Sequence, residues 1–142
     1  MHTNSLGRLV AILHRNNQMY LNSHLKPWDI TSGEVGILMR LYSKEGKTQE
    51  ELSQWMHIDK AAITRTIHTL EEKGIIIRKQ DSKDRRCNRI YLTEKGKQLE
   101  AEIVPIVRSW SEHISKIIGQ EAYTMLCEEL ESLLSVLKKE SV

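Results

Sequence analysis

Basic and acidic side chains are interleaved between residues 80 and 87 in a pattern that suits contact with a chain of phosphates. The flanking segments Ile75–Lys79 and Asn88–Leu92 mix β-branched with charged residues, which is typical of short strands. Two strands joined by a cationic tip form a β-ribbon that can lie against a polyanion. Neighbouring carboxylates would hold the cations in place. The charged residues of the tip are Asp81, Lys83, Asp84, Arg85 and Arg86.

The charge of the 142-residue chain is unevenly distributed. Its formal net charge is only +2, which says little about binding partners. Residues 73–97, however, hold nine Lys and Arg against three Asp and Glu, whereas residues 98–142 hold four against eight. A basic region confined to the predicted ribbon indicates a nucleic-acid-binding surface. A hairpin that is merely solvated is the alternative explanation of the same charges.

The segment before the ribbon is predicted to be a helix that enters a DNA groove. Asp59 can cap a helix from Lys60 to about Lys73, and Gly74 is a stop signal. The stripe expected to be buried consists of Ala62, Ile63, Ile67 and Leu70. The opposite face can enter a major groove. The residues of that face are Lys60, Ala61, Thr64, Arg65 and His68.

Roles on this face follow from side-chain chemistry. Arg65 can make a bidentate contact to a guanine edge or bind a phosphate. Ala61 and Thr64 are small enough to approach a thymine methyl group, and Lys60 in the first turn favours a phosphate. For His68, contact with DNA and an ordinary exposed position are both open. Arg89, in the second strand of the ribbon, is expected to pair with Asp84 or to face the DNA backbone.

Two capping boxes, at residues 31–34 and 48–51, predict the starts of the two preceding helices. Residues 45–47 are expected to form a turn between them. Thr48 and Gln49 can in addition bind a phosphate through side chains and backbone amides, although capping alone also explains Thr48.

Apolar residues with helical spacing predict long helices at both ends of the chain, over residues 6–26 and from Thr93 onward. Pro105 is expected to kink the second of these near residues 101–105, and Gly119 is expected to end or bend it. The apolar stripes are too extensive for solvated tails. We predict that they pack against the same helices of a second copy; covering the DNA-binding domain within a monomer is the alternative.

The tip motif Asp84-x-Arg86, followed by LTEKG at Leu92–Gly96 and preceded by LEEKG at Leu70–Gly74, resembles the MarR family of bacterial transcription regulators. The resemblance covers nearly the whole chain. It implies an obligate dimer in which two winged helix-turn-helix domains lie beneath a helical dimerisation region and bind a pseudo-palindromic operator. It also implies that Arg86 enters a minor groove while Asp84 orients it, and that a small molecule or an oxidant changes DNA affinity.

Sensing is less clearly encoded. The family's thiol-based sensors carry a cysteine in the first helix, and this chain has none there. Cys87 lies beside Arg86, which would favour its thiolate. An oxidation switch on the wing is one interpretation, but a solvent-facing bystander is the favoured one, and Cys127 is expected to be a core residue. Neither the cysteines nor the six histidines have metal-ligand spacing, so we expect no metal and no cofactor. A small-molecule pocket would lie between the first, second and fifth helices. Residues that could line it, although a core or hinge role is the favoured interpretation for each, are His14, Trp28, Met39, Tyr42 and Trp110.

The expected fold is mainly α with a small β-wing. Residues 1–30 are predicted to form an N-terminal dimerisation helix, residues 31–97 a winged helix-turn-helix domain, and residues 98–142 the C-terminal dimerisation helices. The two isolated cysteines and the lack of a long apolar run predict a cytoplasmic protein. No catalytic motif is recognisable, so an enzyme is not expected.

The predicted function is that of a homodimeric transcriptional regulator, taken to be a repressor, which binds double-stranded DNA with sequence specificity. The alternative is a winged-helix module for protein–protein interaction.

Overall fold

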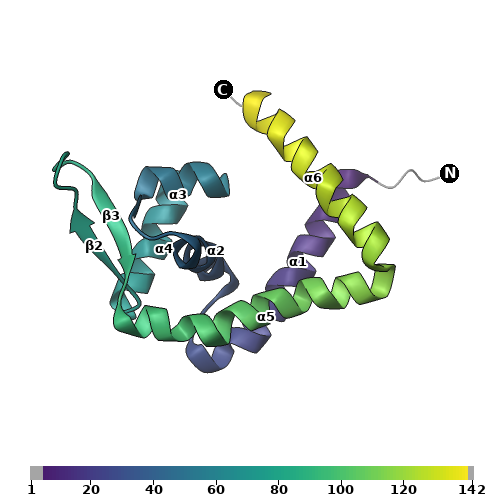
Figure 1. Ribbon diagram of the computed structural model, residues 1–142, viewed down its shortest axis with the longest axis horizontal. Helices are drawn as coiled ribbons and strands as arrows, with labels where there is room; N and C mark the ends of the chain where they lie inside the picture. Colours follow the sequence, from purple (N-terminus) through teal and green to yellow (C-terminus); the bar gives the residue numbers. More distant parts are fainter. Residues whose placement is uncertain (1–4, 141–142) are drawn as a thin grey trace. The chain divides into compact units, whose positions relative to one another are not determined.

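The computed structural model describes residues 5–140 of the chain (Figure 1). The chain divides into two compact units, Met1–Ile106 and Val107–Val142. The helices are α1 (Leu6–Leu25), the 3₁₀ helix η1 (Lys26–Trp28), α2 (Ser32–Ser43), α3 (Gln49–Met56), α4 (Lys60–Glu72), α5 (Glu94–Ile118) and α6 (Gln120–Glu140). The strands are β1 (Lys47–Thr48), β2 (Ile76–Gln80) and β3 (Asn88–Leu92).

The predicted helix starts are confirmed by their capping contacts. At α2 the Thr31 N–H donates to Glu34 Oε1 at 2.8 Å, which is the return bond of a capping box. At α4 the Asp59 carboxylate accepts from the backbone N–H of Ala62 at 2.9 Å. Each contact satisfies an amide that has no partner within its helix, and so fixes where the helix begins.

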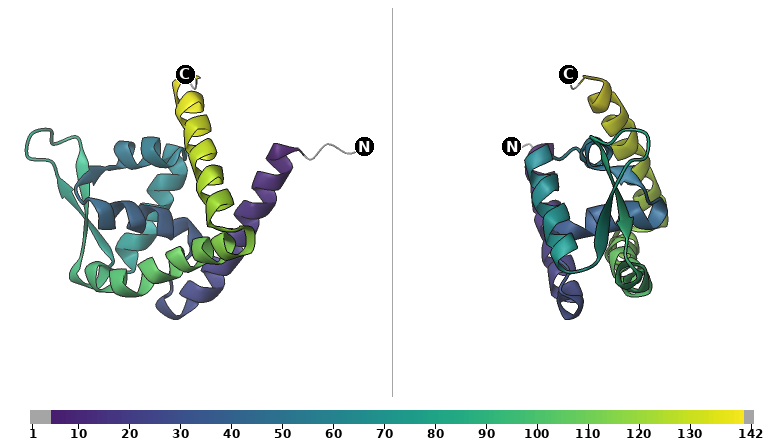
Figure 2. Two further views of the ribbon diagram at one scale, coloured as in Figure 1. Left: turned by 45° about the vertical axis from the view of Figure 1, so that its right-hand side comes forward. Right: turned by 90° about the vertical axis from the view of Figure 1, so that its left-hand side faces the viewer.

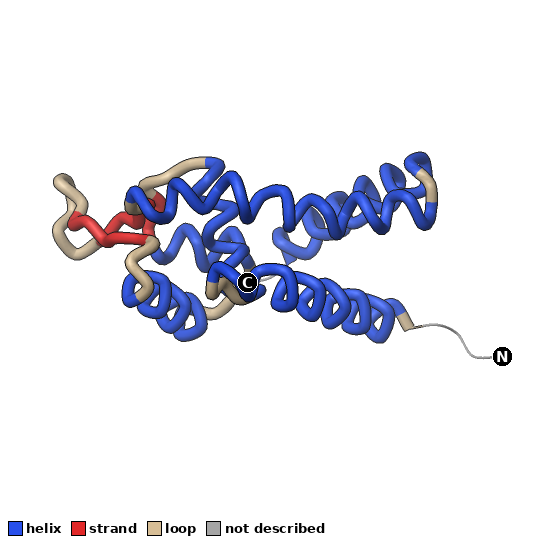
Figure 3. Tube along the Cα trace, turned by 90° about the horizontal axis from the view of Figure 1, so that it is seen from below, coloured by secondary structure: helices blue, strands red, loops and turns tan. Residues whose placement is uncertain are grey.

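The sheet has three strands in the order β1-β3-β2, and both pairings are antiparallel. Lys47 of β1 and Arg78 of β2 both pair with Ile90 of β3. The turn predicted at residues 45–47 is therefore partly wrong, because Lys47 and Thr48 add a third strand. The first strand of the ribbon also begins one residue later than predicted. Figures 2 and 3 show the loop between β2 and β3 projecting away from the helices.

The core of the first unit lies where α1, α2, α3, α4 and the sheet converge. Ile63, Ile67 and Leu70 of α4 are at most 1% exposed, which confirms the predicted stripe except at Ala62, which is half-buried. Burying three such side chains stabilises the fold by roughly 1.5–3 kcal/mol each. The other fully buried side chains are Leu25, Ile37, Leu38, Leu41, Leu52, Ile75, Ile90 and Ile103.

The second unit consists of the C-terminal part of α5 together with the whole of α6. The two helices are joined at Gly119. Gly119 has φ +92°, a left-handed conformation that favours glycine and ends α5 as predicted. Upstream of it, α5 remains one helix through Pro105; the kink predicted there stays a prediction. Cys127, which was expected in a core, is only half-buried. Large apolar side chains exposed on α6 are Met125, Leu126, Leu130, Leu133, Leu134, Val136 and Leu137.

No helix in the described part of the chain combines the length and apolar character needed to span a bilayer.

The start of α5 is fixed to the start of the ribbon by a close backbone contact at Gly96. A Cβ at this position would lie 2.2 Å from the carbonyl oxygen of Ile75. The Thr93 hydroxyl donates to the Gly74 carbonyl at 2.6 Å and accepts from the Gly96 N–H at 3.1 Å. The Thr and Gly of the LTEKG motif therefore hold the two ends of the ribbon together.

Replacing Gly96 by Ala is expected to lower the free energy of unfolding by about 1–3 kcal/mol, because backbone must move to admit the methyl group. Urea denaturation of the full chain measures this. Gly33→Ala, at a position inside α2, is the matched control. The added Cβ would meet only Thr31 Oγ1 at 3.8 Å, so the substitution should be neutral or should raise the free energy of unfolding by up to about 1 kcal/mol. Equal losses in both variants would contradict the close-contact explanation.

Candidate nucleic-acid interface

The outward face of α4 carries the five side chains predicted to face DNA. Lys60, Ala61, Thr64, Arg65 and His68 are all exposed. Their exposure follows from the burial of the opposite stripe, because residues three and four apart share one face of a helix. His68 Nε2 lies 2.9 Å from Glu72 Oε1, so this side chain already has a partner at the far end of the face.

The N-terminus of α3 is joined to this face. The Gln49 side-chain amide donates to the Thr64 hydroxyl, which in turn donates to the Lys60 carbonyl at 2.7 Å. Thr48 accepts from the backbone N–H of Glu51 at 3.1 Å and so acts as the cap of α3. Thr48 and Gln49 are half-buried. The helix-turn-helix therefore brings Gln49 and Thr64 into contact, which the sequence did not indicate.

The loop beyond β2 and β3, residues 81–87, is organised by two carboxylates. Asp81 Oδ1 accepts from the Lys83 N–H at 2.8 Å, and Asp84 Oδ1 accepts from the Arg86 N–H at 3.1 Å. The loop is closed by the Asp81 N–H, which donates to the Cys87 carbonyl at 2.9 Å. Such short-range bonds between Asp and backbone are typical of tight turns. They give the charged tip a defined shape.

Arg86 and Asp84 are paired at the end of this loop. Arg86 Nε lies 3.1 Å from Asp84 Oδ1, and Nη2 lies 3.4 Å from Oδ2. The Arg86 side chain is nevertheless 91% exposed, so the contact directs the guanidinium without covering it. The expectation that Asp84 orients Arg86 agrees with this geometry. The other two cations of the tip, Lys83 and Arg85, are exposed.

Arg89 has different partners from those considered in the sequence. Its Nε lies 2.9 Å from Asp81 Oδ2, and its Nη1 donates to the Gly46 carbonyl at 2.7 Å. The prediction that it would pair with Asp84 or face the DNA backbone is therefore wrong. Arg89 instead ties the loop to the residue before β1. Asp81 and Arg89 stabilise the wing together.

Both carboxylates of the loop stay ionised to a lower pH than an ordinary aspartate does. The pKa of Asp81 is lowered by the Lys83 backbone N–H and, further, by Arg89. The pKa of Asp84 is lowered chiefly by its hydrogen bonds with the Arg86 side chain and backbone. Because the pKa of each carboxyl is lowered, these contacts are fully present at any pH above the ordinary carboxyl pKa of about 4. They are lost only as the pH falls through the lowered pKa of each group.

Cys87 is not the activated thiol that its position beside Arg86 suggested. The pKa of its thiol is raised, first by partial burial and then by the Asp84 carboxylate, whose Oδ2 lies 3.6 Å from Sγ. Arg86 acts in the opposite direction but more weakly. The predicted stabilisation of the thiolate is therefore wrong, because burial and the Asp84 carboxylate together outweigh the effect of Arg86 on the pKa of the thiol.

Of the five candidate small-molecule contacts, four belong to the first unit and one to the second. His14 is exposed on α1, whereas Trp28, Met39 and Tyr42 are half-buried in the same unit. The Tyr42 hydroxyl donates to the Gly96 carbonyl at 3.0 Å, and burial, with Glu100 nearby, raises the pKa of Tyr42 to about 12. Trp110 belongs to the second unit. Within residues 5–140, no three His, Cys, Asp or Glu side chains could hold a metal ion together.

A winged helix-turn-helix protein is defined by two short helices and a three-stranded sheet, with an exposed face on the second helix and a charged loop projecting between β2 and β3. Known proteins agree with this class. The model of the MarR family matches residues 30–88. The HTH-type transcriptional regulator BilQ of Clostridioides difficile (strain CD3) is 30% identical over 126 residues, covering 89% of this chain and 85% of that protein.

Solved structures match over almost the whole chain. The crystal structure of a MarR transcriptional regulator from Methanosarcina mazei Go1 has a TM-score of 0.88 and 35% identity, covering 94% of this chain and 96% of that one. The transcriptional repressor CouR, solved bound to a 23-mer DNA duplex, has a TM-score of 0.83 at 20% identity and shares the fold, covering 92% of each chain. The chain belongs to the MarR family and is a transcriptional regulator, not an enzyme.

The Asp84–Cys87 contact gives a testable reactivity. In a Cys127→Ala background, alkylation of Cys87 by iodoacetamide should reach half its maximal rate at a higher pH than alkylation of free cysteine. Asp84→Asn should move that midpoint to lower pH, because the nearby negative charge is removed while Arg86 remains. Lys83→Gln is the control and should leave the midpoint close to that of the background protein. An unchanged midpoint in Asp84→Asn would exclude the electrostatic explanation.

Proposed function

We propose that this protein is a homodimeric repressor that binds a pseudo-palindromic operator through α4 and the residue 81–87 loop, its wing. The observation that carries the proposal is the pairing of an exposed helix face with an exposed arginine held by its own carboxylate. Groove-reading proteins need both a helix that fits the major groove and cations at the flanking backbone.

The roles of individual residues follow from their exposure and contacts. Arg65, exposed in mid-helix, is proposed to read a guanine edge, and Ala61 and Thr64 to allow close approach to the bases. Arg86 is proposed to enter the minor groove, where negative potential is concentrated when the groove is narrow. Residues proposed to contact phosphates or support this surface are Thr48, Gln49, Lys60, His68, Lys83, Asp84 and Arg85.

The homodimer is supported by apolar surface on both terminal helices. On α1, Leu6, Val10 and Leu13 are between 48% and 59% exposed, and the apolar residues of α6 are similarly exposed. Such surface on a small chain marks an interface. We propose residues 1–30 and 98–142 as the dimerisation region and residues 31–97 as the DNA-binding domain. Two copies related by a two-fold axis would bind two half-sites.

Cytoplasmic location and release by a small molecule complete the proposal. The candidate contacts of that molecule remain the five residues given above, of which Tyr42 already bonds Gly96 at the start of α5. Selection of bound duplexes from a random library by the full chain tests the central claim. An inverted repeat is expected among the selected sequences; the absence of any selected duplex at low ionic strength would favour a protein–protein module instead.

Arg65→Ala and Arg86→Ala are expected to differ in kind. Arg65→Ala should cost about 1–3 kcal/mol and relax base preference at one position, whereas Arg86→Ala should weaken binding to all duplexes and reduce the salt dependence by about one phosphate contact. Titrations of the selected duplex and a scrambled duplex at two salt concentrations separate these effects. The exposed Lys26 of η1 supplies a charge-matched control, Lys26→Ala, which should behave as wild type. Wild-type binding by both arginine variants would refute the groove assignment.

Sedimentation of the purified chain should give twice the 16.5 kDa of one copy. The double variant Leu130→Asp/Leu134→Asp should shift the measured mass towards that of a single copy, because two charges would be buried in the proposed interface. Ser132→Asp adds a charge at an exposed polar position of the same helix and should leave the dimer intact. A wild-type chain that sediments as one copy at micromolar concentration would contradict the proposal.

A further inference from the structure

We propose that Lys73 is a positioning residue for DNA recognition: its ion pair with the buried Glu34 fixes the end of α4 where the helix meets the wing. The pair would thereby decide whether Arg65 and Arg86 can occupy adjacent grooves at the same time. This inference rests on the proposed DNA-binding function and adds a residue that does not touch DNA.

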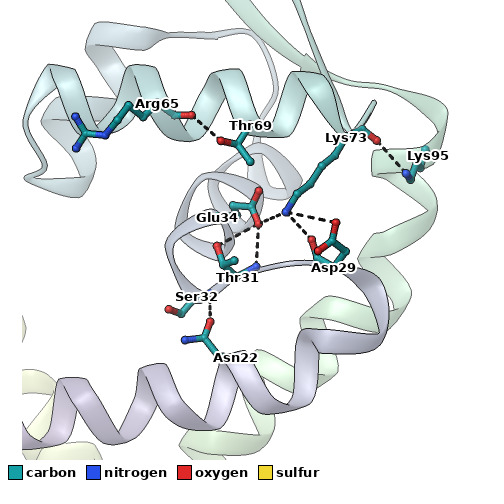
Figure 4. A network of polar contacts seen from close by, with 9 residues as sticks. All are labelled: Asn22, Asp29, Thr31, Ser32, Glu34, Arg65, Thr69, Lys73 and Lys95. Atoms are coloured by element: carbon teal, nitrogen blue, oxygen red, sulfur yellow. Dashed lines mark hydrogen bonds and ion pairs between the residues drawn. The ribbon is translucent and has the colours of Figure 1, made fainter.

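Lys73 follows the last residue of α4 and precedes the turn into β2. Its Nζ lies 2.8 Å from Glu34 Oε1 and donates to the Asp29 carbonyl at 2.6 Å, with the Asp29 carboxylate 4.0 Å away (Figure 4). The Lys73 side chain is only 19% exposed. With its ammonium group occupied in this way, Lys73 is directed into the protein and is not placed to bind a phosphate.

Glu34 is itself held rigidly at the start of α2. It is 2% exposed, and its Oε1 also accepts from the Thr31 N–H at 2.8 Å and the Thr31 hydroxyl at 3.1 Å. Ser32, the residue after Thr31, donates its N–H to Asn22 Oδ1 of α1 at 2.7 Å. The anchor that receives Lys73 is therefore tied to two helices, as Figure 4 shows.

Gly74, the residue after Lys73, is bonded to both sides of the junction. It has φ +72°, a left-handed conformation that favours glycine. Its N–H donates to the Glu71 carbonyl at 2.9 Å, and its carbonyl accepts from the Thr93 hydroxyl at 2.6 Å. The Lys73 carbonyl accepts from Lys95 Nζ of α5 at 2.9 Å. The side chain and carbonyl of Lys73 thus fix the end of α4, and Thr93 fixes the start of the ribbon.

Stability alone does not account for this pair. Removing two charges from water is costly, and apolar residues of similar size are often at least as stabilising. The cost is increased because Glu34 Oε2 is buried and has no hydrogen-bond partner among the described residues. What a short charge–charge contact adds over an apolar one is a defined direction. A fixed direction at this junction is what reading two grooves with one rigid body requires.

The test compares Lys73→Met with the double variant Glu34→Gln/Lys73→Met in the full chain, using the selected duplex and a scrambled duplex. Lys73→Met leaves a buried carboxylate without its cation and should be less stable. The double variant removes both charges, and the amide oxygen of the glutamine retains the Thr31 contacts, so its unfolding midpoint should return towards wild type. In both variants the affinity for the selected duplex should fall at least about tenfold, or ~1.4 kcal/mol, with little change for the scrambled one.

Lys26→Met, at an exposed position of η1, controls for the loss of one positive charge and should keep the wild-type ratio of the two affinities. A double variant that regains both wild-type stability and the wild-type ratio would show the pair to be structural only and overturn the inference. A wild-type ratio of the affinities for the selected and the scrambled duplex in Lys73→Met would overturn the inference as well. A wild-type chain with equal affinity for the two duplexes would instead overturn the proposed function, and this inference with it.

Discussion

The burial of one stripe of α4 is the constraint on which the rest of the proposed DNA-binding surface depends. With Ile63, Ile67 and Leu70 almost fully covered, the helix cannot rotate about its axis without exposing apolar surface. The face opposite is therefore presented to solvent in one orientation only. Small polar and basic residues on that face could change without loss of the fold, since none of them contributes to the core. The proposed recognition role and the stability of the fold thus depend on different sides of the same helix.

The wing is stabilised by charge where the helix is stabilised by apolar packing. Its loop has no buried side chain, and its shape comes from Asp81 and Asp84, each bonded to backbone N–H groups and to one arginine. The two arginines are used differently: Arg89 is turned inward to the carbonyl of Gly46, whereas Arg86 remains almost fully exposed. The two Asp–Arg pairs also offset part of the local positive charge. A loop built in this way keeps its form without a core of its own.

Local signals in the sequence were sufficient for the helices and insufficient for contacts between distant residues. The caps at Thr31 and Asp59, the stop at Gly74 and the strand Asn88–Leu92 were all predictable, because each depends on residues within a few positions. The strand β1 was missed because two residues carry no periodicity, and its partner lies more than 40 positions away. The expectations for Arg89 and Cys87 were based on neighbours along the chain. Arg89 instead pairs with Asp81, eight positions away, and the pKa of the Cys87 thiol is set by burial and by the Asp84 carboxylate. The Glu34–Lys73 pair, 39 positions apart, had no local signal at all.

A mechanical property follows from the continuity of α5 across the boundary between the two units. Its 25 residues rise about 1.5 Å each, and a hydrogen-bonded helix resists stretching far more than bending. Any displacement of the second unit therefore reaches Thr93 and Gly96 as flexure or torsion rather than as elongation. Pro105 lies one residue from the end of the first unit and lacks the amide hydrogen that would bond the carbonyl of Ala101. One backbone hydrogen bond of α5 is therefore missing next to the place where the two units join.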